Sequence, residues 1–256
     1  MAERKVALVT GAATGIGAAT VRAFAARGVD VGINHLGNSD IAGAQATATS
    51  CRESGVRAHL FQADVGSPEQ CRTLIDRTVA ELGRLDYLVN NAGYTKGRPL
   101  TDLDSVEPIE FERSFAVNCM GPFYLTRYAA PHLRATGAGA IVNIASVAGL
   151  TGFGSSHPYC ASKAGLINMT RSTARVLGPE IRVNVVCPGL VNTPWPVREL
   201  GDQYGRIAEM VATRTVTRKI VEPEEIANAV LFLAMEATQI AGEVVRVDGG
   251  GHLGAG

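Results

Sequence analysis

Short apolar runs alternate with longer helical patterns along almost the whole chain, and this alternation limits the possible folds more than any other feature. Seven runs are predicted as strands: Val6–Thr10, Val29–Asn34, Val56–Gln62, Tyr87–Asn90, Ala140–Ser146, Arg182–Cys187 and Val244–Asp248. Helices are predicted between them, near residues 16–27, 39–54, 67–82, 110–135, 158–177 and 223–236. Nearly unbroken apolar strands that alternate with helices predict an α/β fold, a doubly wound three-layer sandwich. Its sheet is expected to be mostly parallel, with about seven strands flanked by helices.

The chain of 256 residues contains no low-complexity linker and no internal repeat, so a single domain over residues 1–256 is predicted. Residues 188–222 depart from the alternation: they are rich in Pro, Thr and Arg and too long for an ordinary connection. Long connections of this kind are often functional, so this segment is predicted to be a substrate lid. The 24 acidic and 24 basic residues cancel, which argues against a nucleic-acid or membrane surface as partner.

The five cysteines are scattered and include no Cys-x-x-Cys pair, which argues against a disulfide framework or a zinc site and favours a reducing compartment. The five histidines have no metal-ligand spacing, and no metal site is predicted. Met1–Lys5 lead directly into a strand, without an apolar signal run, and no stretch of 18 apolar residues occurs. A cytoplasmic protein is expected.

A glycine-rich turn, Thr10–Gly17, joins the first strand to the first helix. Its glycines, Gly11, Gly15 and Gly17, permit a tight turn and close approach of the backbone to a ligand. The helix that follows offers free N–H groups and the positive end of its dipole to a pyrophosphate. The spacing differs from the G-x-G-x-x-G of many dinucleotide-binding folds. The turn nevertheless predicts nucleotide binding.

Polar or turn-forming residues occur where successive strands end. In parallel sheets, ligands bind outside the carboxyl ends of the strands, so these residues are expected to share one functional edge. They are Asn34, His35, Asp64, Val65, Asn90, Asn91, Ala92, Gly93, Ser146, Pro188 and Gly189.

Tyr159 and Lys163 are four residues apart in a predicted helix and therefore share one helix face. A nearby ammonium favours the phenolate, so Lys163 is expected to lower the pKa of Tyr159 from its ordinary value of about 10. Such a phenol could donate or accept a proton near neutral pH. Ser146 ends a predicted strand, where its hydroxyl could hold a substrate oxygen.

In combination these motifs resemble the short-chain dehydrogenase/reductase family, from about Lys5 to Gly250. The resemblance rests on Thr10–Gly17, Asp64, Asn90–Gly93, Asn118, Ser146, Tyr159-x-x-x-Lys163, Pro188-Gly189 and Thr193. It implies a Rossmann-type fold and an NAD(P)-dependent oxidoreductase that moves a hydride between the nicotinamide and a carbonyl or secondary alcohol.

The resemblance also implies roles for individual residues. Tyr159 would be the general acid or base, Lys163 would bind the nicotinamide ribose, and Ser146 would polarise the substrate oxygen. Asn118 would hold a water that links Lys163 to solvent. Asp64 would meet the adenine, and Thr193 the nicotinamide amide or the phosphates. The full predicted cofactor site is Gly11, Thr14, Gly15, Ile16, Gly17, Asn34, His35, Asp64, Val65, Asn91, Ala92, Gly93, Tyr159, Lys163, Pro188, Gly189 and Thr193.

The residue that closes the second strand often distinguishes the two nicotinamide cofactors. A carboxylate there binds the ribose hydroxyls and repels a 2′-phosphate. His35 stands at this position, and an arginine typical of NADP users is missing nearby. His35 and Asn38 could bind a phosphate, so NADP is slightly favoured over NAD.

The substrate pocket is expected at residues 94–98, 147–157 and 190–215, with Trp195 as one wall. Its small and apolar composition suggests a medium-sized carbonyl or alcohol. One alternative is an enzyme like the 3-oxoacyl-[acyl-carrier-protein] reductases, although only Arg171 and Arg175 offer basic charge near the end of the Tyr159 helix. Others are a non-catalytic cofactor-binding protein and a related epimerase or dehydratase. The resemblance also implies a homotetramer or homodimer, paired through helices 110–135 and 158–177.

Overall fold

The structure is a computed structural model that describes residues 4–254; residues 1–3 and 255–256 of the predicted domain lie outside the described residues. Within the described part, seven strands form one sheet, in the order β3-β2-β1-β4-β5-β6-β7, and every pair is parallel. The strands are β1 (Val6–Val9), β2 (Asp30–His35), β3 (Ala58–Gln62), β4 (Tyr87–Asn90), β5 (Gly139–Ile144), β6 (Ile181–Pro188) and β7 (Val244–Val247). The predicted α/β fold and parallel sheet are confirmed.

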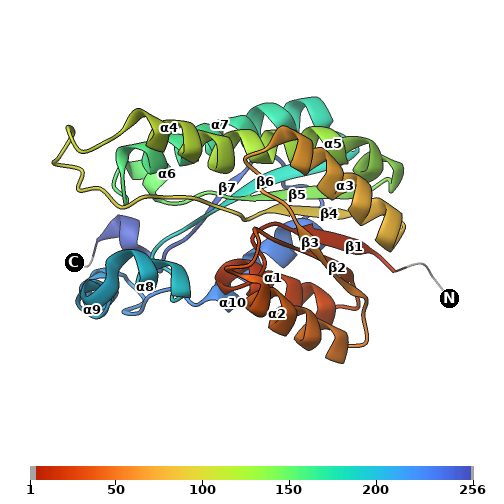
Figure 1. Ribbon diagram of the computed structural model, residues 1–256, viewed down its shortest axis with the longest axis horizontal. Helices are drawn as coiled ribbons and strands as arrows, with labels where there is room; N and C mark the ends of the chain where they lie inside the picture. Colours follow the sequence, from red (N-terminus) through yellow and green to blue (C-terminus); the bar gives the residue numbers. More distant parts are fainter. Residues whose placement is uncertain (1–3, 255–256) are drawn as a thin grey trace.

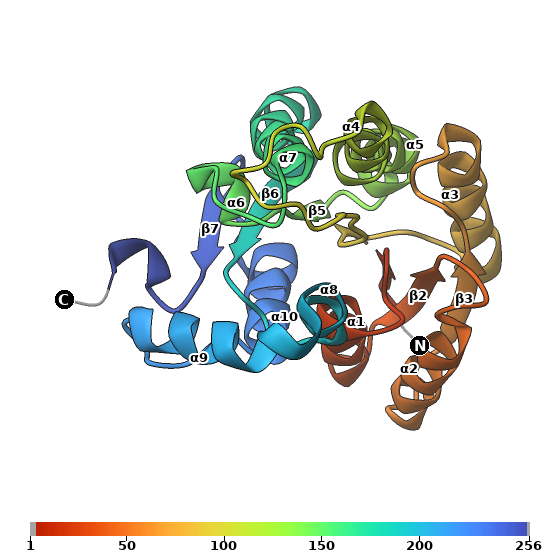
Figure 2. The same cartoon turned by 60° about the vertical axis from the view of Figure 1, so that its left-hand side comes forward.

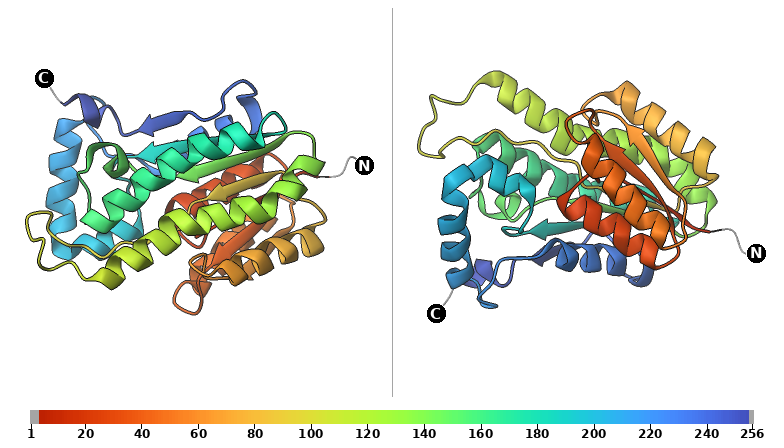
Figure 3. Two further views of the ribbon diagram at one scale, coloured as in Figure 1. Left: turned by 90° about the horizontal axis from the view of Figure 1, so that it is seen from above. Right: turned by 60° about the horizontal axis from the view of Figure 1, so that its bottom comes forward.

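Helices cover both faces of this sheet and make a three-layer sandwich (Figures 1 and 3). One face carries α3 (Pro68–Leu82), α5 (Gly121–Ala135) and α7 (His157–Leu177), with α4 (Pro108–Phe115) leading into α5. The opposite face carries α1 (Gly15–Ala26), α2 (Ile41–Glu53) and α10 (Pro223–Leu231). None of the helices within residues 4–254 combines the length and apolarity needed to cross a membrane.

The side chains of β1 show why both faces are covered. Successive residues of a strand point to opposite faces. Val6 and Leu8 accordingly join the core under α3 and α5, whereas Ala7 and Val9 join the core over α1 and α2. Because all four side chains are fully buried, the strand must be apolar throughout, as the sequence is.

The order of the strands reverses between β1 and β4, since β1 continues outward to β2 and β3 while β4 continues to β5. In open parallel sheets such a reversal opens a crevice at the carboxyl ends of the strands, where ligands bind. The segment that contains α8 (Pro194–Leu200), η2 (Gly201–Gln203) and α9 (Tyr204–Arg214) lies at this end of the sheet (Figure 2). The predicted lid is therefore largely helical rather than irregular.

The single helix predicted over residues 110–135 is wrong in one respect. A π-helix, η1 (Ala116–Met120), separates α4 from α5 and contains Asn118. Pro122 has no N–H to donate to the carbonyl of residue 118, which breaks the regular ladder at this point. The helix predicted near 223–236 likewise ends in a π-helix, η3 (Phe232–Glu236). The sequence analysis also missed the short helix α6 (Ala148–Thr151).

Candidate active site

The glycine-rich turn between β1 and α1 forms a tight backbone cradle. Gly11 and Gly15 have φ angles of +60° and +57°, in the region that favours glycine. A Cβ at Gly17 would collide with the carbonyl oxygen of Gly11. Thr14 precedes α1 without a side-chain hydrogen bond to the helix, so the first N–H groups, Ile16 among them, are not capped by it. This geometry fits a diphosphate group at the helix N-terminus.

Three side chains hold the cradle in shape. Asn34 Oδ1 accepts from Gly11 N at 3.2 Å, while Asn91 Nδ2 donates to the carbonyls of Thr10 and Gly11 at 2.8 and 3.0 Å. Thr10 Oγ1 accepts from the backbone N–H groups of Asn91 and Ala92, both at 3.0 Å. Asn34 and Asn91, predicted as cofactor contacts, thus bind the backbone that would hold the cofactor. Thr10 was missed as a site residue, although it lies in the quoted motif.

His35 ends β2 and is buried, with no hydrogen-bond partner for Nδ1 among the described residues. The nearest carboxylate belongs to Asp40, whose Oδ1 lies 3.7 Å from His35 Nδ1. The same carboxylate accepts from the backbone N–H groups of Leu36 and Gly37 at 3.0 and 2.9 Å. The sequence analysis found His35 but missed Asp40, which shapes the loop after it.

Asp64, predicted to meet the adenine, forms an ion pair in which Arg113 Nη1 lies 2.9 Å from Asp64 Oδ2. Asp64 Oδ1 also accepts from Gly66 N at 2.8 Å. Val65 beside it is buried, in the core under α3 and α5. Arg113 comes from α4, 49 residues further along the chain, and no local pattern indicates it.

Ser146, Tyr159 and Lys163 meet near the end of β5. Ser146 follows the strand by two residues, and its Oγ accepts from Ala148 N at 3.1 Å. Ser156 begins α7 by accepting from Tyr159 N at 3.3 Å, which places Tyr159 in the first turn of that helix. Lys163 is 2% exposed, and its Nζ donates to Ile144 O at 2.8 Å. The structure brings the predicted triad together.

The expected lowering of the pKa of Tyr159 is not found. Burial raises the pKa of Tyr159 to about 12, and a hydrogen bond with Ser146 opposes this shift. Lys163 Nζ lies 5.8 Å from the centre of the Tyr159 ring, against its face, and donates to a backbone carbonyl. Burial also lowers the pKa of Lys163 to about 8. Desolvation therefore decides the direction of both shifts.

Asn118 is fully buried and makes three hydrogen bonds. Its Oδ1 accepts from Tyr94 N at 2.7 Å, and its Nδ2 donates to Tyr94 O at 2.8 Å and to Ser162 Oγ at 2.9 Å. Asn118 thus ties the loop after β4 to α7, next to Lys163. Ser162, between Tyr159 and Lys163 on this helix, was missed because a serine inside a helix carries no distinctive pattern.

The remaining predicted contacts lie around the end of β6. Pro188 O accepts from Val147 N at 3.0 Å, and Gly189 N donates to Val247 O at 3.0 Å. The methyl carbon of Thr193 lies 3.1 Å from the point where a Cβ of Gly15 would stand, so the start of α8 touches the cradle. Trp195 reaches over Gly93 and packs edge-on against Tyr159, with ring centres 6.2 Å apart.

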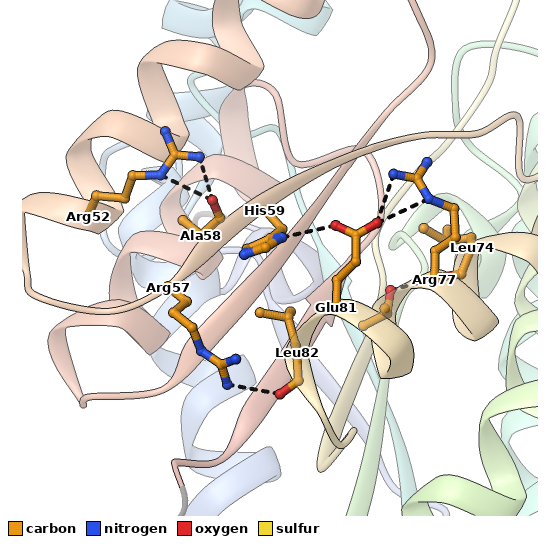
Figure 4. Close-up of polar contacts among 9 residues, drawn as sticks. Arg52, Arg57, Ala58, His59, Leu74, Arg77, Glu81 and Leu82 are labelled. Carbon is orange, nitrogen blue, oxygen red and sulfur yellow. Dashed lines mark hydrogen bonds and ion pairs between the residues drawn. The ribbon is translucent and has the colours of Figure 1, made fainter.

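A second group of charged residues lies far from these, at the outer edge of the sheet beside β3. We call Arg52, Arg57, His59, Arg77 and Glu81 the outer-edge cluster. Four of them line a hollow of about 490 Å³, and the fifth, Arg77, binds Glu81 beside it (Figure 4). None of the residues predicted to bind the cofactor lines this hollow.

Comparisons with known proteins match nearly the whole chain. Residues 11–252 match the family model described as enoyl-(acyl carrier protein) reductase. The cis-4-hydroxycyclohexanecarboxylate dehydrogenase of Sinomonas cyclohexanicum is 39% identical over 96% of this chain and 96% of its own length. The 3-oxoacyl-[acyl-carrier-protein] reductase of Thermotoga maritima is 34% identical over 97% of this chain and 98% of its own.

Solved structures match equally well. A protein of Burkholderia xenovorans described as a short-chain dehydrogenase/reductase has a TM-score of 0.92 and 35% identity, covering 99% of this chain and 100% of its own. Xylitol dehydrogenase, solved with bound NAD⁺, has a TM-score of 0.87 and 28% identity, covering 98% and 100%. The relatives named here as enzymes are dehydrogenases or reductases.

Proposed function

The chain belongs to the short-chain dehydrogenase/reductase family, and from that premise we propose that Tyr159 gives a proton to the substrate oxygen during reduction and takes it back during oxidation. As a member of this family it is an NAD(P)-dependent oxidoreductase that acts on CH–OH and C=O groups. The carrying observation is the convergence of three side chains at the end of β5: Ser146 follows that strand, Tyr159 lies in the first turn of α7, and the buried Lys163 places its Nζ 5.8 Å from the centre of the Tyr159 ring.

The chemistry of this pair follows from its surroundings. Burial raises the pKa of Tyr159, so the phenol is protonated at neutral pH and carries the proton that reduction of a carbonyl requires. Ser146 holds the substrate oxygen beside it and stabilises the negative charge that develops there. Lys163 keeps an ammonium close to the ring, with a pKa of about 8, and so stabilises the phenolate that remains after proton transfer.

The nicotinamide cofactor is proposed to lie across the carboxyl ends of the strands. The cradle of Gly11, Thr14, Gly15, Ile16 and Gly17 would hold the diphosphate, and its uncapped helix N-terminus supports this assignment. The bound nicotinamide supplies or accepts the hydride. The further contacts proposed are His35, Asp64, Val65, Asn91, Ala92, Gly93, Tyr159, Lys163, Pro188, Gly189 and Thr193, with Asn34 supporting the cradle.

Asn118 is proposed to hold a water that resupplies protons to Lys163. Its position in the π-helix, hydrogen-bonded to Ser162 on the same helix as Lys163, supports this role. Residues 188–222 are proposed as the lid of a single domain, since Thr193 and Trp195 reach the cradle and Tyr159.

NADP is proposed as the preferred cofactor. No carboxylate closes β2, where His35 stands, and the carboxylate of Asp40 is engaged by the N–H groups of Leu36 and Gly37. A 2′-phosphate would therefore meet less negative charge than an acid at position 35 would present. The test compares kcat/KM for NADPH and NADH in the wild type and in His35→Asp. A strong preference of the wild type for NADH would contradict the proposal.

The experiment that tests the function follows NADPH and NADH oxidation at the nicotinamide absorbance, against ketones, aldehydes and 3-oxoacyl thioesters. Turnover by the wild type that disappears in Tyr159→Phe would support a reductase that depends on Tyr159. Equal turnover in the two proteins would overturn it.

A 3-oxoacyl-[acyl-carrier-protein] reductase is a second candidate. One relative has that activity in its name, and Arg171 and Arg175 are both exposed on α7, where an acidic carrier could dock. The test is turnover of an acyl-carrier thioester compared with that of the free thioester. Equal rates for both, or none with the carrier, would remove this candidate.

We also propose that the protein is a homotetramer or homodimer and that it is cytoplasmic. Phe111, Met120 and Phe123 are exposed along α4, η1 and α5, and Val176 is exposed on α7, so these helices offer apolar surface to another subunit. All five cysteines, each within the described residues, are unpaired, which suits a reducing compartment. Light scattering coupled to gel filtration measures the assembly, and a monomer would contradict it.

A further inference from the structure

Trp195, the only tryptophan of the chain, packs next to Tyr159, the proposed proton donor. Its ring stands nearly perpendicular to that of Tyr159, at 88°, with the ring centres 6.2 Å apart. Edge-to-face packing of this kind is a favourable aromatic geometry. The indole therefore bounds the space in which a substrate can approach the Tyr159 hydroxyl.

The indole of Trp195 also lies against Gly93. If Gly93 carried a Cβ, that atom would lie 2.9 Å from Trp195 Cη2 and 3.2 Å from Cζ3. The φ angle of Gly93 is not in the left-handed region, so its backbone does not require glycine. Its third neighbour, Asn118 Oδ1, would be at an ordinary contact distance of 3.5 Å. The side chain that excludes a larger residue at position 93 is therefore Trp195.

The segment that carries Trp195 has little core of its own. No residue from 192 to 214 is buried, and the buried Val191 and Val221 pair at its base. Pro194 and Pro196 restrict the backbone on both sides of Trp195. A segment with so few buried contacts is locally weak, so the contact with Gly93 and Tyr159 contributes much of what fixes the indole.

We propose that Gly93 and Trp195 form a size filter: Gly93 makes room for the indole, and the indole limits the bulk of the group beside the substrate carbonyl. This inference rests on the proposed role of Tyr159 and adds a specificity-determining residue to it. The substrates that fit are ketones or aldehydes with at least one small substituent. Widening the space by shortening residue 195 should admit bulkier ones.

The first test uses the emission of the single tryptophan and needs no turnover. In Gly93→Ala the new methyl would lie 2.9 Å from Trp195 Cη2 and therefore displaces the indole. Trp195 emission should then shift to longer wavelength, and acrylamide should quench it about twice as strongly. Gly205→Ala is the matched control, because a Cβ there meets nothing within 4 Å. Unchanged emission and quenching in Gly93→Ala would overturn the proposal.

The second test measures selectivity. Trp195→Ala should raise kcat/KM for a bulky ketone relative to a small one by about 10-fold or more, with Trp195→Phe in between. In Gly93→Ala kcat/KM should fall about 10-fold, and Gly93→Ala/Trp195→Ala should recover most of that loss. Unchanged selectivity in Trp195→Ala, or no recovery in the double variant, would contradict the filter.

The two proposals fail separately. Turnover retained in Tyr159→Phe would remove the proposed proton donor, yet it would leave the emission of Trp195 in Gly93→Ala as expected. Conversely, unaltered emission would remove the filter while the loss of turnover in Tyr159→Phe remained.

Discussion

The carboxyl ends of the strands, which we call the active end of the sheet, and the outer-edge cluster both contain titratable side chains. The two regions have opposite effects on the charged forms of these side chains. In the cluster, Arg77 and His59 both bind Glu81, at 2.9 and 3.0 Å (Figure 4). At the active end, burial raises the pKa of Tyr159 and lowers that of Lys163, so both charged forms are disfavoured. Groups held against their ordinary ionisation are typical of functional sites.

The remaining arginines of the cluster explain its presence. Arg52 Nε and Nη2 donate to Ala58 O at 3.1 and 2.5 Å, and Arg57 Nη2 donates to Leu82 O at 2.8 Å. Ala58 begins β3, the edge strand, whose exposed backbone could pair with another chain. Charged side chains that bind this edge protect it from such pairing. The charged residues around the hollow of about 490 Å³ therefore have a structural role. The size of the hollow does not make it the active site.

After the loss of the Tyr159 hydroxyl itself, the largest effect is expected at Lys163. Lys163→Met should lower kcat/KM by about 10²-fold or more, because the phenolate of Tyr159 loses its nearby ammonium. The same change should raise the free energy of unfolding at pH 7, since the protein no longer buries a charge. Steady-state kinetics and denaturant unfolding measure the two effects.

The pH dependence of that stability provides the control. Lys163 has a pKa of about 8 in the folded protein and 10.5 when exposed to water in the unfolded chain, so below pH 8 it is charged in both states and the cost of burial is fully present. The stability advantage of Lys163→Met should therefore shrink as pH rises from 8 to 10.5. A variant less stable than wild type at pH 7 would contradict the argument.

Ser146→Ala should have the next largest effect. Loss of the hydroxyl that holds the substrate oxygen is expected to lower kcat by about 10²-fold. Because Ser146 is only partly buried, the melting temperature should change little. An unchanged kcat would place the substrate oxygen elsewhere.

Arg57→Ala tests the outer-edge cluster, to which we assign a structural role. Arg57 Nε donates to Asp30 Oδ2 at 2.8 Å, and the side chain of Asp30 is 1% exposed. The variant keeps the bond from the backbone N–H of residue 57 to Asp30 Oδ1 but removes the guanidinium from a buried carboxylate, which should cost about 1–3 kcal/mol of unfolding free energy. Arg4→Ala is the matched control, because Arg4 lies further from Asp30, at 3.7 Å, and should cost less. Activity should be unchanged in both, and a large loss of kcat/KM would link the cluster to catalysis.

Glu81→Gln should have the smallest effect. Hydrogen bonds from His59 and Arg77 hold the pKa of Glu81 below its usual value, but its side chain is 35% exposed. Exposed pairs of this kind contribute at most about 1 kcal/mol, and salt screens them. Unfolding at low and high salt measures this, and a salt-independent loss above that size would contradict the surface assignment.

The sequence was sufficient for the architecture and for the proximity of Tyr159 and Lys163, because both rest on repeated or closely spaced residues. Alternating apolar runs predict a parallel sheet, and Tyr159 and Lys163 are four residues apart on one helix. The π-helix at Ala116–Met120 was not predictable in this way, since one extra residue in a turn hardly alters the helical pattern.

The shift in the pKa of Tyr159 was predicted with the wrong sign, because it was inferred from spacing alone. Spacing places Lys163 beside Tyr159, but it does not show that the ammonium is buried and binds Ile144 O, or that desolvation raises the pKa of the phenol. The pair of Asp64 and Arg113 likewise depends on contact between α4 and the loop after β3. Such terms need three-dimensional structure, because burial and distant partners decide them.

The central claim, that proton transfer occurs at Tyr159, is tested most directly by kcat/KM of Tyr159→Phe on the best ketone or aldehyde, with cofactor binding measured by calorimetry in the same protein. The substitution removes only the hydroxyl, so cofactor affinity should be nearly kept while kcat/KM falls about 10³-fold or more. Cofactor binding with kcat/KM within a few-fold of wild type would contradict the account.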